Sequence, residues 1–161
     1  MADELSEIYA LFRDAYDATP IDHAGCTAAL EQSAKLVADS PSARTHALRA
    51  LLLFEAARIP ARVDKRGQLV PLRAQDRRRW DRNMLDLALE HLDAASIGYE
   101  MSPYHLEAAI AACHAIASTH AETNWSRIVF LYDKLLKAQP SLAVVELRAQ
   151  AQQALDELTT K

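Results

Sequence analysis

Residues 124–141 read N-W-S-R-I-V-F-L-Y-D-K-L-L-K-A-Q-P-S, and this stretch decides the fold. Its apolar residues recur mostly three or four positions apart, which places them on one broad face of a helix. They are Trp125, Ile128, Val129, Leu131, Tyr132, Leu135 and Leu136. Asn124 is a suitable N-cap, because its side-chain oxygen can accept a free backbone N–H. Pro140 ends the predicted helix, since the residue before a proline is disfavoured in the α region.

A second stretch has the same form. Residues 35–42 (K-L-V-A-D-S-P-S) parallel residues 134–141 (K-L-L-K-A-Q-P-S), and their prolines are 99 residues apart. That separation is close to three tetratricopeptide (TPR) units of about 34 residues. The order Tyr132, Leu135, Pro140 is also typical of the second helix of a TPR unit. The units between are degenerate, and an ordinary amphipathic helix in each place is the alternative interpretation.

Composition supports an all-α fold in one domain, residues 1–161. Half of the residues are hydrophobic and only 3 are glycine, while alanine and leucine dominate. We therefore expect about seven helices, stacked as TPR-like antiparallel helix pairs. The expected helices span residues 4–17, 22–39, 42–59, 74–96, 102–116, 124–139 and 141–158. Residues 61–72 are expected to form a hairpin or loop around Gly67.

Several residues are expected at helix ends. Asp22 and Ser42 are predicted N-caps, and Ser102 is a third, followed by Pro103 at the first helical position. Gly98 is placed just past the end of a helix, where a left-handed backbone is common. Cys26 and Cys113 both lie in helical patterns, which favours buried free thiols over a disulfide.

Charge and hydropathy exclude some functions. The formal net charge is −4, which argues against tight nucleic-acid binding, because that requires neutralising phosphates. No run of about 20 apolar residues is present, so no membrane span is expected. The first residues, M-A-D-E, lack the basic region of a signal peptide, which favours a cytoplasmic location.

Three motifs, in order, resemble one known protein family. Residues 69–82 (L-V-P-L-R-A-Q-D-R-R-R-W-D-R), 102–115 (S-P-Y-H-L-E-A-A-I-A-A-C-H-A) and 123–136 (T-N-W-S-R-I-V-F-L-Y-D-K-L-L) carry the likeness. They resemble the TPR-like C-terminal region of one group of bacterial extracytoplasmic-function (ECF) RNA polymerase sigma factors. Residues 8–16 resemble the start of that region, with R-D-A where the family has N-E-G. The resemblance covers roughly residues 5–148.

The resemblance implies a role in the regulation of transcription through protein contacts. A complete sigma factor of this kind carries two DNA- and polymerase-binding regions before this one, and they are absent here. The chain is thus interpreted as an excised domain or a free-standing relative. Sigma-factor regions or RNA polymerase are the expected partners.

Clusters that suggest other chemistry have simpler explanations. The arginines around Trp80 alternate with Asp76 and Asp81, so i,i+4 ion pairs such as Arg77 with Asp81 are expected on a solvated helix. His105, Cys113, His114 and His120 lack the spacing of a metal site, and the pair His23 and Cys26 supplies only two ligands. No triad or phosphate-binding glycine loop is present.

We therefore expect a regulatory protein-interaction domain with no catalytic site, cofactor or metal. A concave face would capture a segment of the partner. The candidate contact residues are Arg77, Trp80, Tyr104, His105 and Trp125, together with the loop at Arg66 and Gly67. The alternative is a small-molecule sensor or enzyme with a pocket near residues 102–116, where Tyr104, His105 and Glu107 would do acid–base work.

Overall fold

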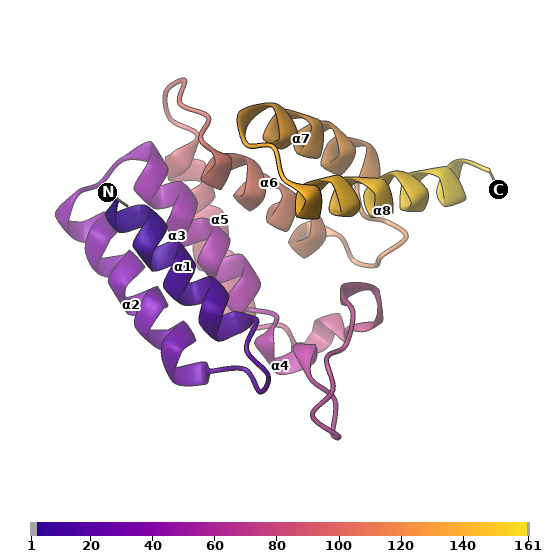
Figure 1. Ribbon diagram of the computed structural model, residues 1–161, viewed down its shortest axis with the longest axis horizontal. Helices are drawn as coiled ribbons and strands as arrows, with labels where there is room; N and C mark the ends of the chain where they lie inside the picture. Colours follow the sequence, from indigo (N-terminus) through magenta and orange to yellow (C-terminus); the bar gives the residue numbers. More distant parts are fainter. Residues whose placement is uncertain (1–2, 161) are drawn as a thin grey trace.

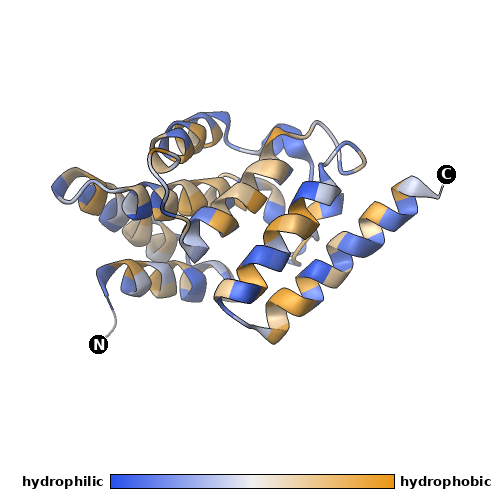
Figure 2. Ribbon diagram, turned by 90° about the horizontal axis from the view of Figure 1, so that it is seen from above, coloured by the Kyte–Doolittle hydropathy of each residue, from blue (hydrophilic) through white to orange (hydrophobic). Residues whose placement is uncertain are grey.

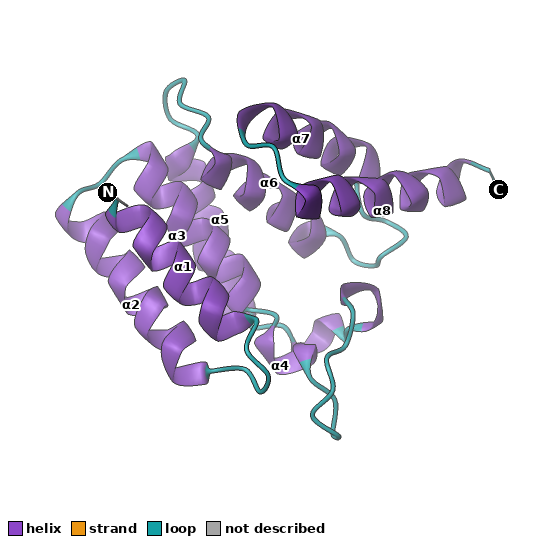
Figure 3. Cartoon of the chain, in the orientation of Figure 1, coloured by secondary structure: helices purple, strands orange, loops and turns teal. Residues whose placement is uncertain are grey.

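The computed structural model describes residues 3–160, which form helices joined by turns and loops (Figure 1). The eight α-helices are α1 (Glu4–Tyr16), α2 (His23–Asp39), α3 (Ala43–Ala56), α4 (Ile59–Arg62), α5 (Arg82–Ala95), α6 (Pro103–Ile116), α7 (Trp125–Ala138) and α8 (Leu142–Thr159). Two 3-10 turns, η1 (Leu72–Ala74) and η2 (Arg77–Arg79), precede α5. Residues 3–160 contain no strand (Figure 3), so the all-α prediction is confirmed.

The longer helices stack as successive pairs. Helix α1 packs on α2, α3 on α5, and α6 on α7, while α8 packs on the outer helix of the last pair (Figure 1). Helix α3 also contacts both helices of the first pair and reaches α6. This arrangement follows the predicted stacking of helix pairs, and the short helix α4 and the two 3-10 turns are the elements that the prediction lacked.

The predicted N-caps are in place. An oxygen of Asp22 accepts the backbone N–H of Gly25 at 2.9 Å, and an oxygen of Asn124 accepts that of Arg127 at 3.1 Å. Ser42 and Ser102 each form a capping box with the third residue of their helix. These bonds satisfy N–H groups that have no partner inside the helix, which is why the helices begin where the sequence predicts.

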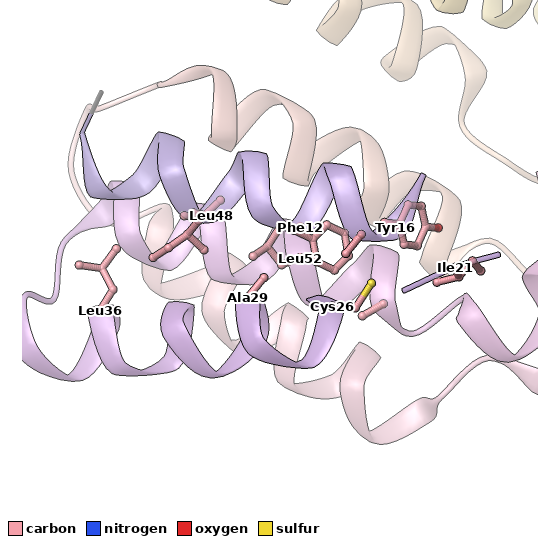
Figure 4. Close-up of a cluster of buried hydrophobic side chains, with 11 residues drawn as sticks. Phe12, Tyr16, Ile21, Cys26, Ala29, Leu36, Leu48 and Leu52 are labelled. Atoms are coloured by element: carbon pink, nitrogen blue, oxygen red, sulfur yellow. The ribbon is translucent and has the colours of Figure 1, made fainter. Parts of the chain in front are cut away.

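Helix α3 lies at the centre of the core. Its residues Leu48 and Leu52 are buried against Phe12 of α1 and Ala29 of α2 (Figure 4). On its other side, Leu51, Leu53 and Phe54 belong to a second buried cluster with α5 and α6. The outer helices instead alternate hydrophobic and hydrophilic residues along their length (Figure 2), as amphipathic helices do. The apolar pattern of residues 48–54 thus reflects burial on several sides.

The fourth predicted helix begins later than expected, and the prediction of a start at residue 74 was wrong. Asp76 and Asp81 each have extended backbones and act as caps, of η2 and α5 respectively. The backbone N–H of Asp81 also donates to the carbonyl of Ala57 at 2.9 Å. The expected pair of Arg77 with Asp81 does not form, and Arg78 pairs with Asp76 instead at 3.0 Å.

Pro60 opens a helix and does not close one. Helix α3 ends at Ala56, and Pro60 occupies the first turn of α4, where its missing N–H costs nothing. The following loop does turn around Gly67, which has a φ of 79°, and Val63 and Leu69 face each other in a single antiparallel bridge. Cys26 and Cys113 are buried free thiols, as predicted.

Candidate functional site

A groove of about 600 Å³ lies between the first helices and the last three. One side is formed by α1, α3 and the turn at Pro71–Arg73, and the other by α6, α7 and α8. Its lining combines apolar residues with charged and polar ones. The apolar residues that line it are Leu51, Leu72, Ile110, Ala111, Ile128, Leu135, Val144, Leu147, Ala151 and Ala154.

Helix α8 leaves much of its apolar surface free. Its one fully buried residue is Ala151, because α8 packs mainly against α7. Leu147 remains 44% exposed and faces the groove, whereas Leu142, at 86% exposed, does not line it. An apolar helix face beside a groove is a common feature of surfaces that bind amphipathic helices.

An ion pair closes one polar end of the groove. The guanidinium of Arg13 donates to Glu55 Oε1 at 3.2 Å, and its second nitrogen lies 2.5 Å from Oε2. The same guanidinium lies 5.0 Å from the ring centroid of Tyr16. Burial raises the pKa of the Glu55 carboxyl, although the charge of Arg13 opposes this shift. Two charges removed from water are thereby held in a fixed geometry.

Glu107 is a second acid at this end. Its Oε1 accepts a hydrogen bond from the hydroxyl of Tyr9 at 3.3 Å. Burial, followed by the nearby charge of Glu55, raises the pKa of Glu107 to about 7. Burial and these two acids also raise the pKa of Tyr132, to about 12. Glu107 therefore exchanges a proton near neutral pH, while Tyr132 keeps its own.

Two histidines and a tryptophan form the other end. His114 packs edge-on against Trp125 with ring centroids 5.4 Å apart, and His120 lies 4.8 Å away on the same ring. The indole N–H of Trp125 donates to the carbonyl of His120 at 3.1 Å. Burial, helped by the charges of Arg58 and Arg77, lowers the pKa of His114 to about 3, so its ring is neutral at pH 7.

Trp80 and Arg77 stabilise contacts within the protein, and neither residue lines the groove. Trp80 is only 3% exposed, and its indole N–H donates to the side-chain oxygen of Gln75 at 3.2 Å. Arg77 lies over the Trp80 ring, 4.6 Å from its centroid, and donates to the carbonyls of His114 and Ala117. The pair joins the segment before α5 to the end of α6.

His105 and Tyr104 also lie outside the groove. His105 is buried, with Nδ1 bonded to the Ser102 backbone N–H at 3.0 Å and Nε2 3.0 Å from the carbonyl of Ala95. Tyr104 is half-buried and packs on Tyr9, with ring centroids 5.8 Å apart. His105 is thus held by the cap of α6 and by Ala95, whereas Glu107 lines the groove.

Of the five candidate contact residues, Trp125 alone lines the groove. Sequence reasoning also missed Arg13, Glu55 and Tyr132. They lie on three different helices, so no local spacing relates them. One of them could have been found from the sequence, because Glu55 is a charged residue within the apolar stretch of α3.

A basic segment borders the groove. Residues 57–82 contain nine of the 18 Lys and Arg residues and only three Asp residues, a net charge of +6 within a chain of −4. This segment includes α4 and both 3-10 turns and extends away from the stacked pairs (Figure 1). Lys65, Arg66 and Arg73 are exposed, and Arg73 lines the groove. The distribution gives the groove a positive rim on one side.

Within residues 3–160, no three His, Cys, Asp or Glu side chains gather as ligands of a metal ion would. Over the same residues, no helix combines the length and the hydropathy needed to cross a membrane.

Comparison with known proteins gives two matches. Residues 2–96 match the model of a family described as "Family of unknown function (DUF6596)", and the chain belongs to this family. An uncharacterized protein of Rhizobium meliloti (strain 1021) is 44% identical over 104 residues, which cover 65% of this chain. The match spans only 25% of the length of that relative. No solved structure matches the chain.

Proposed function

We propose that this member of DUF6596 is a regulatory protein-interaction domain that holds a segment of its partner in the groove. The observation that carries the proposal is the groove between α3 and α8, in which Leu147 of α8 is exposed and Val144 is half-buried. Stacked helix pairs commonly bind through such a concave surface. The bound segment would be an amphipathic helix whose apolar face meets Leu147, Val144 and Leu72.

The charge beside the groove specifies the partner further. The rim formed by residues 57–82 is positive, so the flank of the bound helix that faces it should be acidic. Duplex DNA is a rival for a basic surface. The remainder of the chain is strongly acidic, however, and would repel a long phosphate backbone.

The resemblance in three ordered motifs supports a partner in transcription initiation. We propose an acidic helical segment of a sigma-factor region or of RNA polymerase. The Rhizobium meliloti relative is compatible with this, since it holds a related segment within a much longer polypeptide. The proposal places the chain in the regulation of initiation and assigns it no promoter recognition of its own.

The test uses purified sigma-factor regions and RNA polymerase, titrated against the immobilised chain. Leu147→Glu puts a charge on the groove wall and should weaken binding at least about tenfold. Leu142→Glu makes the same change on the same helix away from the groove and should leave affinity within about twofold. Both side chains are exposed, so both variants should fold.

A second pair of variants tests the rim. Arg66→Glu with Arg73→Glu should weaken binding and reduce its salt dependence, because it removes two exposed positive charges of the basic segment. Lys134→Glu with Lys137→Glu makes the same change on the exposed face of α7, away from the groove, and should have little effect. Absence of binding to every sigma region and to polymerase would overturn the proposal, as would tight, salt-sensitive binding to DNA alone.

A small-molecule sensor is the second candidate. The observation in its favour is the buried cluster of Arg13, Glu55, Glu107 and Tyr132 at one end of the groove. Converging titratable groups in a pocket are typical of ligand sites. This function predicts that small ligands raise the melting temperature while no macromolecule binds.

A further inference from the structure

The acid cluster in the groove contains one carboxylate that has a cation and one that does not. Arg13 uses two nitrogens on Glu55. Among residues 3–160, Glu107 forms no ion pair, and its hydrogen-bond partner is the uncharged hydroxyl of Tyr9, on Oε1. Its second oxygen, Oε2, has no hydrogen-bond partner within that part of the chain. Glu107 lines the groove, so this oxygen is the free acceptor of the cluster.

The surroundings of Glu107 define what could bind there. Ile110 lies one turn beyond the acid on α6, and Leu51 of α3 lines the same groove. The titratable groups that face it are Tyr9 and Arg13 from α1, Glu55 from α3, Tyr104 from its own helix and Tyr132 from α7. Arg13 is already bound to Glu55, and the three tyrosines remain neutral near pH 7. The missing group is a cation on an apolar stem.

We propose that Glu107 receives the ammonium group of a lysine from the bound segment, with the aliphatic stem of that lysine along the apolar lining of the groove. A lysine buries its methylene groups along apolar surface while its charge reaches a polar partner. This inference rests on the proposed function, since it identifies a residue that the docked helix must carry. The acidic flank of that helix then faces the rim, and the lysine faces the floor of the groove.

Proton linkage follows from this placement. Without a ligand, burial and Glu55 hold the pKa of Glu107 at about 7, so much of the carboxyl is protonated at neutral pH. A bound ammonium favours the ionised form and lowers that pKa. Binding therefore releases a proton and becomes tighter as the pH rises from about 6 to about 8, while the amine is still charged.

The probe is n-hexylammonium, with 1-hexanol as its uncharged counterpart. Each is titrated into the full chain while the carboxyl carbon of Glu107 is followed by NMR. Hexylammonium should shift this signal and lower the pKa of Glu107 by about one unit. Glu107→Gln should weaken hexylammonium binding at least about fivefold and leave hexanol binding unchanged. Glu157→Gln, a matched change at another position of the groove lining, should bind both probes as the wild type does.

The outcomes separate this inference from the proposed function. If hexanol binds as well as the amine, or Glu107→Gln binds the amine normally, the lysine site is wrong even when a sigma region binds the groove. If the amine binds at Glu107 but no sigma region or polymerase binds the chain, the protein-capture function fails. The pKa of Glu107 can also be measured in the wild-type chain with and without hexylammonium. If the amine leaves this pKa unchanged, the inference is overturned.

Discussion

The Nδ1 atoms of His46 and His91 lie 2.9 Å apart and join α3 to α5. One ring must donate and the other accept, so the contact requires that they share one proton. A second proton would place two donors, and two positive charges, face to face. Burial, with the charges of Arg49 and His46, accordingly lowers the pKa of His91 to about 4.

This pair predicts a loss of stability in mild acid. Because the folded-state pKa of His91 lies below its unfolded value of about 6.5, the folded chain binds fewer protons. The stabilisation is complete above pH 6.5 and is lost as the pH falls towards 4. His91 is only half-buried, so we expect a loss of about 1 kcal/mol. Urea denaturation at several pH values measures this pH dependence of the free energy of unfolding. His91→Phe should reduce the dependence. If the variant keeps it unchanged, the contact between His46 and His91 is not its cause.

Removal of Glu55 should expose the importance of its ion pair. Glu55→Ala leaves the buried guanidinium of Arg13 without its partner, and we expect the free energy of unfolding to fall by about 2 kcal/mol. Asp133→Ala is the matched control, since it breaks the more exposed pair with Arg148 and should cost less than about 0.5 kcal/mol. Equal losses in the two variants would show that burial of the Arg13 pair contributes nothing.

Substitution of Trp80 should damage folding. The ring is buried with Leu85 and Phe54 in the second cluster, so Trp80→Ala should lower the free energy of unfolding by about 3 kcal/mol or more. Trp80→Phe keeps most of the apolar volume but leaves Gln75 without its indole donor, and should cost about 1 kcal/mol. Tyr99→Ala, on a fully exposed ring, is the control and should be neutral. A Trp80→Ala chain with wild-type stability would contradict this placement.

Helix α8 should be the least protected of the long helices. It has one fully buried residue and packs mainly against α7, whereas α3 is buried on several sides. Backbone amides in α8 should therefore exchange with solvent about 100-fold faster than those in α3, as measured by hydrogen exchange and mass spectrometry. A ligand in the groove should slow exchange in α8 most. Equal protection of the two helices would contradict this.

The local features of the chain were readable from the sequence because they depend on near neighbours. Asp22, Ser42, Ser102 and Asn124 cap helices where their side chains reach an N–H two or three residues ahead. The same reasoning failed for the segment before α5, where it predicted a helix from residue 74. Its arginines and aspartates fit a helical ion-pair pattern, but burial of Trp80 and the bond from Asp81 to Ala57 accompany two short 3-10 turns in place of an α-helix.

The sequence by itself determined the all-α class and most helix ends, since periodicity and capping act over a few residues. Only the tertiary structure decided which side chains share the groove. Glu55 and Glu107 are far apart in the chain, and stacking of α3 on α6 brings them to one end of the groove. Their chemistry depends on exclusion of water by that packing, which no local pattern records.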